Sequence, residues 1–337
     1  MIRLLIAQEA RGSYGLSAET MTRSGIRSAD SASSHVRSLD DLALEQSARA
    51  RALGNPVGRA TPRELPRVRD TAKSRLVPGF FGDRERQLFG IYHAPDSDVQ
   101  RDAGVVLCYP GPQEYSQSHW AYAKLAGMLA ASGLHVFRFD YFGTGESAGR
   151  ADDGTLDQWV CDIESAIQEL RDISGTRRIS LMGMRLGAVL ANRVVRCGTR
   201  VRDLVLWDPA VDGRRYVAEL DRVEGIRLSQ LQYPEPDEPV AGELMGHSFL
   251  PAMRDATAAV NFLTEPIGSV DRVMIVSSEP DAAQQALHDR FVASGLASTL
   301  RVVEDPKLYR GDAHPTDSIL AHNIPVAITE FLARNRG

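Results

Sequence analysis

Hydrophobic and polar residues alternate along most of this chain in blocks that predict a repeated order of strand and helix. Short continuous apolar runs, typical of strands buried on both faces, are followed by segments with helical periodicity. The predicted strands cover 86–95, 104–110, 134–140, 177–183, 203–209, 271–279 and 298–305, and the predicted helices cover 116–133, 155–175, 186–196 and 325–335. This alternation indicates an α/β fold with a mostly parallel, doubly wound sheet.

The segment 155–175 shows the helical pattern most clearly. Thr155 and Gln158 have the spacing of a capping box, in which the threonine side chain accepts a hydrogen bond from an amide of the first turn. Trp159 and Ile163 begin a run of large apolar residues that continues along one face of the helix. We therefore expect this helix to pack one side against the sheet.

Two regions depart from the alternation. Residues 1–75 are rich in Arg, Ser and Ala and show no sustained period, so they bury too little apolar surface to offset the entropy of ordering. We expect a largely disordered extension, or a stretch that precedes the true start codon. Residues 210–266 are punctuated by Pro and Gly, and we expect them to form a helical lid insertion over the carboxyl ends of the strands. The main domain is then 76–337.

Composition and charge limit the function classes. The net charge is −5 and the acidic excess lies after residue 75, which argues against a nucleic-acid partner. Cys108, Cys161 and Cys197 lie in apolar segments and share no C-x-x-C spacing, so we expect buried, reduced thiols in a cytoplasmic protein. No apolar run approaches a membrane span and the N-terminal run is too short for a signal peptide. No metal-ligand spacing and no Walker or Rossmann motif is present, so no cofactor is expected.

Residues 181–188, LMGMRLGA, have the shape of a nucleophile elbow, a sharp turn between a strand and a helix. Gly183 and Gly187 stand at the small positions of that motif, and Arg185 stands at its tip. Arginine has five donors, no acceptor and a pKa above 12, so it cannot be deprotonated to attack a carbonyl. An acyl-enzyme at position 185 is chemically excluded.

Ligands of parallel sheets bind beyond the carboxyl ends of the strands, and the loops at those ends hold the candidate site residues. In chain order the candidates are Gly111, Gln113 and Glu114 after the strand 104–110, Met184 and Arg185 at the elbow, Asp281 or alternatively Glu279 after the penultimate strand, and His314 after the last strand. Ser116, Ser118 and Ser147 are weaker candidates for a substitute nucleophile.

From about residue 76 onward the chain resembles an α/β-hydrolase. The order of elbow, acid and histidine at positions 185, 281 and 314 matches that family's triad. FDYFGTGES resembles the family's D-x-x-G-x-G-x-S loop, and PGPQEY occupies the oxyanion-loop position. GMRLGA and LVLWDPAVDG are similar to a bacterial subgroup of serine-aminopeptidase-like predicted hydrolases, some associated with exosortase loci, that often carries Arg at the elbow. The resemblance implies an α/β-hydrolase fold and a remnant triad of Asp281 and His314 with Arg185 at the nucleophile position.

The charge of Arg185 calls for an anion, because it adds to the positive end of the helix that follows. An internal carboxylate would make Arg185 a structural lock; the candidates are Glu114, Asp140, Glu279 and Asp281. Glu114 fits this role better than a place in an oxyanion loop, where a carboxylate would repel an oxyanion. A small acyl or anionic ligand would instead make Arg185 a binding residue.

Two main classes of function therefore stay open, besides a purely structural role in a polysaccharide or secretion locus. The first is an α/β-hydrolase-fold protein without serine-nucleophile hydrolysis, which binds a small ligand or a protein partner. The second is an esterase, thioesterase or acyltransferase that uses another nucleophile, or a water activated by His314 and Asp281.

Overall fold

The computed structural model describes residues 76–334 except 97, 230–241 and 306–320. The expectation for residues 1–75 and the candidate histidine His314 therefore lie outside the described residues.

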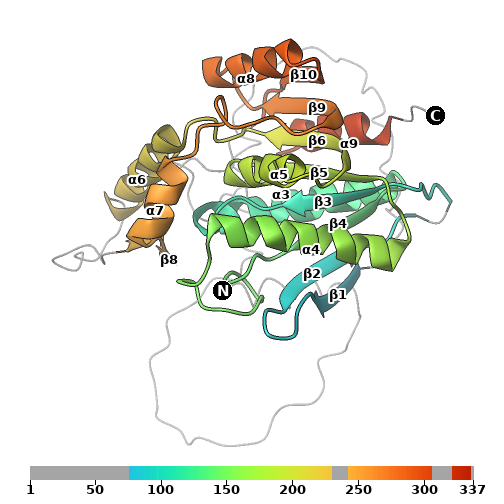
Figure 1. The fold of residues 1–337 in the computed structure, drawn as a ribbon, viewed down its shortest axis with the longest axis horizontal. Coiled ribbons are helices and arrows are strands. Elements are labelled where there is room, and N and C mark those ends of the chain that lie inside the picture. The colour runs from blue at the N-terminus through green and yellow to red at the C-terminus, as the bar shows by residue number, and fades with distance from the viewer. Residues whose placement is uncertain (1–75, 97, 230–241, 306–320, 335–337) are drawn as a thin grey trace, which may run out of the picture. The chain divides into compact units, whose positions relative to one another are not determined.

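An eight-stranded sheet runs through the described part of the chain (Figure 1), in the order β1-β2-β4-β3-β5-β6-β9-β10. β1 and β2 are antiparallel to their neighbours, and the pairs from β4 to β10 are all parallel. The strands are β1 (Leu76–Phe81), β2 (Leu88–His93), β3 (Gly104–Cys108), β4 (His135–Phe139), β5 (Ile179–Met184), β6 (Val201–Trp207), β9 (Val270–Ser277) and β10 (Ala297–Val302). The predicted mostly parallel sheet is confirmed; β1 was missed because most of its residues are exposed and carry no clear alternation.

Helices cover both faces of the sheet, with α4 and α5 packed together on one face and α3 and α9 on the other (Figure 1). Helix α8 packs beside β9 and β10. The bounds are α3 (Pro112–Ala131), α4 (Leu156–Ser174), α5 (Leu186–Arg196), α8 (Ala282–Ala293) and α9 (Asn323–Ala333). The sheet is doubly wound, because the connections between its parallel strands cross over one face or the other.

The N-termini of two helices can be compared with the starts that the sequence predicts. α4 begins as predicted, since the Thr155 side chain accepts a hydrogen bond from the Gln158 amide at 3.1 Å. α3 begins at Pro112, four residues before the predicted start. Proline suits this position for two reasons: the first amides of a helix have no partner within the helix, so the missing N–H costs nothing, and the proline ring fixes φ at a helical value. Gln113 and Glu114 therefore lie in the first turn of a helix and not in a loop.

The expectation of three buried cysteines is wrong for two of them. Cys108 lies in the centre of the sheet and is buried, whereas Cys161 and Cys197 are exposed. Cys161 belongs to the outer side of α4, whose inner side carries the buried Trp159 and Ile163. An apolar neighbourhood in sequence does not decide burial on a helix, because adjacent residues point about 100° apart.

Residues between β6 and β9 form a separate group of elements beside the ends of the strands. They are α6 (Gly213–Ser229), the short pair β7 (Glu243–Leu244) and β8 (His247–Ser248), and α7 (Pro251–Ala258). The two helices pack against each other. We call residues 210–266 the insertion.

Two glycines set the geometry of the turn between β5 and α5. A Cβ atom on Gly183 would lie 2.3 Å from the Gly187 carbonyl oxygen, and one on Gly187 would lie 2.2 Å from the Tyr109 carbonyl oxygen. The turn between β5 and α5 and the end of β3 therefore approach each other more closely than any side chain allows.

We expect Gly187→Ala to lower the free energy of unfolding by about 1–3 kcal/mol or more, because backbone atoms must move to admit the methyl group. Gly225→Ala in α6 is the matched control, since nothing lies within 4 Å of its added Cβ and alanine favours a helix by about 0.5–1 kcal/mol. Urea unfolding of both variants measures the difference; equal effects would contradict the close approach.

Candidate functional site

Arg185 lies between the end of β5 and the first turn of α5, in a backbone conformation that residues other than glycine rarely adopt. Its φ is 53° and its ψ is −118°, a conformation that costs about 1–3 kcal/mol. Two hydrogen bonds hold it: the Arg185 amide donates to the Trp207 carbonyl at 3.0 Å, and its carbonyl accepts from the Ala210 amide at 3.2 Å. The turn is thus fixed by β6 and by the start of the insertion.

The guanidinium group of Arg185 is buried between two carboxylates from distant parts of the chain. Its Nε donates to Glu114 Oε1 at 3.0 Å, and its Nη2 donates to Glu219 Oε2 at 2.5 Å. Arg185 is 6% exposed and Glu114 is 1% exposed. Tyr216 completes the cluster: its hydroxyl donates to Glu114 Oε2 at 2.6 Å, and its ring lies under the guanidinium group at 4.9 Å.

The carboxyl group of Glu114 feels opposing influences. Burial raises its pKa, while the charge and hydrogen bonds of Arg185 and the hydroxyl of Tyr216 lower it, and the net pKa is raised. Burial also raises the pKa of Tyr216 well above its usual value, so this phenol stays protonated and remains a donor. The cluster is a hydrogen-bonded Glu–Arg–Glu arrangement in which two carboxylates share one cation.

Asp140, another expected carboxylate near Arg185, has structural partners at the start of its own loop. Its Oδ1 accepts from the Tyr115 hydroxyl at 2.8 Å, and its Oδ2 accepts from the Glu146 amide at 3.0 Å. These bonds order the turn after β4. Gly145 lies so close to Asp140 that a Cβ there would be 2.1 Å from the carboxylate.

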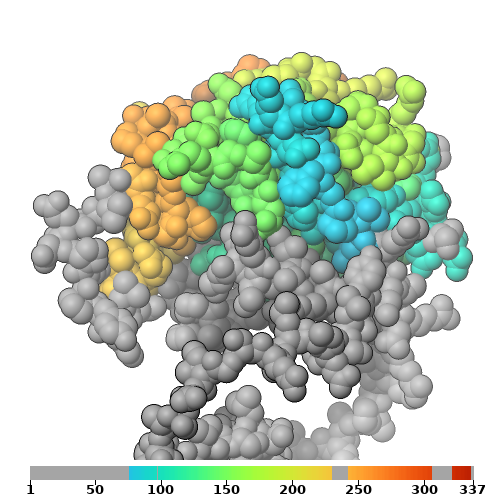
Figure 2. All heavy atoms as spheres, turned by 90° about the horizontal axis from the view of Figure 1, so that it is seen from below, coloured from blue at the N-terminus to red at the C-terminus, as the bar shows by residue number. Residues whose placement is uncertain are grey.

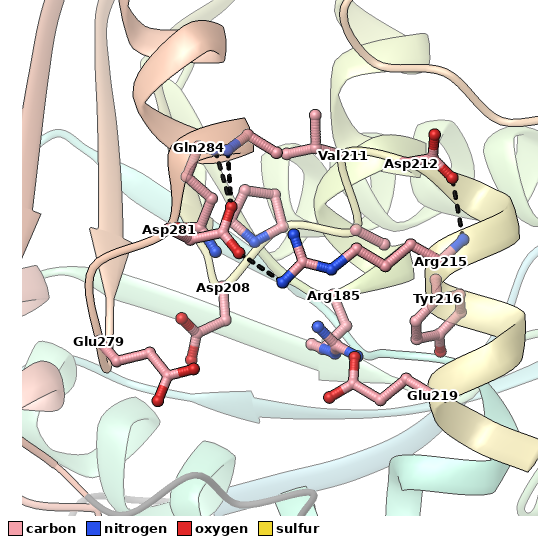
Figure 3. Close-up of a pocket in the computed structure, with 13 residues that line it drawn as sticks. Arg185, Asp208, Val211, Asp212, Arg215, Tyr216, Glu219, Glu279, Asp281 and Gln284 are labelled. Carbon is pink, nitrogen blue, oxygen red and sulfur yellow. Dashed lines mark hydrogen bonds and ion pairs between the residues drawn. The ribbon is translucent and has the colours of Figure 1, made fainter. Parts of the chain in front are cut away.

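Asp281, the expected acid of the triad, caps helix α8. Its Oδ1 accepts from the amides of Ala283 and Gln284, at 2.8 and 3.1 Å, and its Oδ2 pairs with Arg215 at 2.7 Å (Figure 3). Burial alone would raise the pKa of Asp281, but the amide of Gln284 and the Arg215 guanidinium outweigh it, and the pKa is lowered. Asp281 is therefore ionised and engaged with the insertion.

The remaining sequence-predicted residues lie near the elbow in different roles. Gly111 is the N-cap of α3, and Met184 is the buried last residue of β5. Gln113 is buried, and its amide nitrogen donates to the Ser248 carbonyl at 3.4 Å. Glu279 lines the same cavity as Arg185.

Sequence reasoning missed three residues of one helix, α6. Arg215, Tyr216 and Glu219 lie at positions i, i+1 and i+4 and contact Asp281, Glu114 and Arg185 respectively. They lie in the segment 210–266, for which the sequence analysis predicted a lid insertion and no site residue. No short motif links them to the elbow. Their spacing matches one helical face, which is the only signal that could have grouped them.

The cavity beside Arg185 is small and acidic (Figure 3). Its volume is about 50 Å³, which suffices for a few water molecules. Its charged lining, among the described residues, comprises Arg185 and Arg215 on the basic side and Asp208, Asp212, Glu219, Glu279 and Asp281 on the acidic side. An added anion would meet a carboxylate-rich wall.

Asp208 at the end of β6 contributes to that wall and is held firmly. Its φ is 40°, and its two carboxylate oxygens accept from the amide and the hydroxyl of Ser278 at 3.0 and 2.8 Å. This bond pair joins the ends of β6 and β9.

Two other kinds of site are absent from the described residues. In that part of the chain, no three His, Cys, Asp or Glu side chains gather in a way that could hold a metal ion. No helix there combines the length and apolar character needed to cross a bilayer.

Comparisons with known proteins find a matching family and several similar structures. Residues 100–266 match a family described as serine aminopeptidase, S33. An esterase from Pyrococcus furiosus is similar in structure, with a TM-score of 0.53 and 16% identity over 84% of this chain and 97% of that chain. Est1E from Butyrivibrio proteoclasticus, solved with ferulic acid, has a TM-score of 0.53 and 16% identity over 75% and 97%. A hypothetical protein from Pseudomonas aeruginosa has a TM-score of 0.52 and 14% identity over 82% and 99%. No curated protein matches the sequence.

We expect Glu114→Ala to lower the free energy of unfolding by about 3 kcal/mol, because it removes one partner of a buried ion pair and leaves the Tyr216 hydroxyl without its acceptor. The matched control is Asp102→Ala, which breaks the 3.3 Å pair with Arg178, whose side chains are both more than half exposed. That change should cost about 0–1 kcal/mol. Urea unfolding checks both; a loss no larger for Glu114→Ala would contradict the buried pairing.

Proposed function

The chain belongs to the α/β-hydrolase superfamily, and on that premise we propose that it is a binding protein that performs no hydrolysis through an elbow nucleophile. The observation that carries this proposal is the pairing of Arg185 with two internal carboxylates, Glu114 and Glu219. Arg185 is then a structural lock.

The chemistry of the elbow supports this proposal. A nucleophile needs a lone pair that a base can expose, and a guanidinium group carries only donors. The Arg185 side chain also fills the space above the turn and bonds to the first turn of α3 through Glu114. The position where a reacting carbonyl would meet the tip is therefore occupied by an ion pair.

The same pairing supports the lock over an anionic ligand on Arg185. Glu114 and Glu219 already supply two negative charges to one guanidinium group. The cavity on the open side adds further carboxylates from Asp208 and Asp281. An anion entering there would be repelled by more charges than attract it.

A second candidate is hydrolysis without the elbow, by a water molecule that His314 and Asp281 activate. Asp281 favours it in one respect, since it follows β9 and lines the cavity next to Arg185. Against it, the Asp281 carboxylate already accepts two amides and pairs with Arg215. Of the substitute nucleophiles, Ser118 and Ser147 donate to the carbonyls of Tyr115 and Asp140, as structural serines do.

We expect a fluorophosphonate probe to leave the protein unlabelled, because no serine at the elbow can attack the phosphorus atom. A purified serine hydrolase labelled in the same mixture is the positive control. Labelling of the wild type that persists in Arg185→Ala would reveal a nucleophile elsewhere and would sink the proposal. Mass spectrometry of the labelled peptide would identify that nucleophile.

We expect p-nitrophenyl butyrate to be cleaved no faster by the wild type than by His314→Ala. His322→Ala is the matched control, since His322 is an exposed histidine at the start of α9. Turnover that His314→Ala alone abolishes would establish the second candidate. Circular dichroism of each variant excludes unfolding as the cause of a loss.

A further inference from the structure

Two of the three cysteines lie at the surface on neighbouring helices. Cys161 lies in the second turn of α4, and Cys197 is the C-cap of α5. Both thiols are free and exposed, whereas Cys108 is buried. α4 and α5 pack side by side on one face of the sheet (Figure 1), and Figure 2 shows the green segment of α4 at the surface beside the cyan strands β1 and β2. Both thiols are therefore open to reagents in solution.

A hydrogen bond brings the two cysteine-bearing stretches together. Thr199 Oγ1 donates to Glu164 Oε1 at 2.9 Å. Glu164 lies three residues after Cys161, so these two side chains are neighbours on the surface of α4. Thr199 lies two residues after Cys197. The charge of Cys197 also acts on the ionisation of Cys161. The two sulfur atoms therefore belong to one junction between α4 and α5.

The backbone at Cys197 leaves room for the movement that a bond between the two sulfur atoms requires. A disulfide needs Cα atoms about 4.4–6.8 Å apart. Cys197 ends α5, and Gly198 follows it with a φ of 98° and with no atom within 4 Å of an added Cβ. Helix ends open more readily than helix interiors. Only the end of α5 has to adjust, and the buried side of the helix keeps its contacts.

The surroundings of the two thiols differ in charge. Partial burial raises the pKa of Cys161, and nearby carboxylates, Glu164 foremost, raise it further. Cys197 instead follows Arg196 and precedes Arg200 in sequence, and both arginines are exposed. Guanidinium groups beside a thiol favour its thiolate and attract anionic reagents. Cys197 is therefore suited to attack an anionic disulfide, and Cys161 to react in a second step.

We propose that Cys161 and Cys197 form a redox-active pair that closes to an intramolecular disulfide by exchange with an anionic small-molecule disulfide such as oxidised glutathione. The Cys197 thiolate attacks one glutathione sulfur, which leaves a mixed disulfide and expels one glutathione thiolate. The Cys161 thiolate then attacks the Cys197 sulfur and expels the second. Two electrons pass from the protein thiols to oxidised glutathione, and the two thiol protons pass to the glutathione thiolates. The proposal goes beyond the function proposed above, because no step involves Arg185.

Peptide mapping of the full chain tests the bond. The protein is equilibrated with oxidised glutathione, remaining thiols are alkylated, and the digest is analysed without reduction. We expect a cross-linked peptide pair that contains Cys161 and Cys197 and is lighter by two hydrogen atoms than the two reduced peptides. Cys108 should become alkylated only after unfolding. Glutathione on both exposed cysteines without a cross-link, a cross-link only between two molecules, or no reaction at either cysteine would overturn the proposal.

Single variants measure the advantage of the pair. Cys161→Ser and Cys197→Ser each stop at a mixed disulfide with glutathione. At a fixed concentration of reduced glutathione, half-oxidation of the wild type should need at least about tenfold less oxidised glutathione than either variant, because its second step is intramolecular. Cys161→Ser should also react about threefold faster than Cys197→Ser. Equal requirements in wild type and variants would overturn the pair, and a reversed order of rates would contradict the assigned roles.

The double variant Cys161→Ser/Asp172→Cys is the matched control. It keeps two exposed thiols on the same two helices, because Asp172 is also an exposed residue of α4, but it moves one thiol about three turns further along the helix. We expect mixed disulfides at both sites and no cross-link. A cross-link as complete as that of the wild type would show that the junction at Cys161 has no special role. Circular dichroism of each variant confirms that its fold is intact.

Discussion

A cation buried in the interior must be paired, and this constraint governs how three segments of the chain meet. Arg185 brings its charge to the turn between β5 and α5, and Glu114 in α3 and Glu219 in α6 neutralise it. Removing one partner of such a buried ion pair costs on the order of 3–5 kcal/mol. The first turn of α3 and one face of α6 are therefore held in place by electrostatics as much as by apolar contact. The insertion is tied to the rest of the domain through Arg185, the residue at the tip of the turn between β5 and α5.

The retention of the elbow has a packing reason that is independent of catalysis. Gly183 and Gly187 allow β5, the first turn of α5 and the end of β3 to approach one another more closely than a methyl group permits. Arg185 keeps the positive φ of such a turn, and its neighbours Trp207 and Ala210 hold it there through backbone hydrogen bonds. The elbow therefore has a packing role of its own, because strand, turn and helix are built around it. It indicates the fold, whereas the side chain at its tip decides which chemistry is possible there.

The insertion divides the space above the strands into two cavities of opposite character. Near Arg185 the wall is rich in carboxylates, and Asp281 connects it to α6 through Arg215. Beside Leu186 the wall is mostly apolar. The ion-pair cluster lines the former, whose volume is about 50 Å³, and the latter is the larger space, at about 160 Å³.

The order of most strands and helices, the parallel sheet and the turn at Arg185 were determined by the sequence alone, because they depend on local periodicity and on short-range motifs; β1 and α8 were not predicted. Thr155 and Gln158 could be read as a helix start for the same reason. Glu114 could be named as a partner for Arg185 from charge logic, since a carboxylate is misplaced in an oxyanion loop. Glu219 and Tyr216 could not be placed, because their contacts join residues more than thirty positions apart. Only the tertiary structure decides such pairings. A charged or polar side chain at the surface is solvated by water, whereas the same side chain needs a partner within the protein once it is buried.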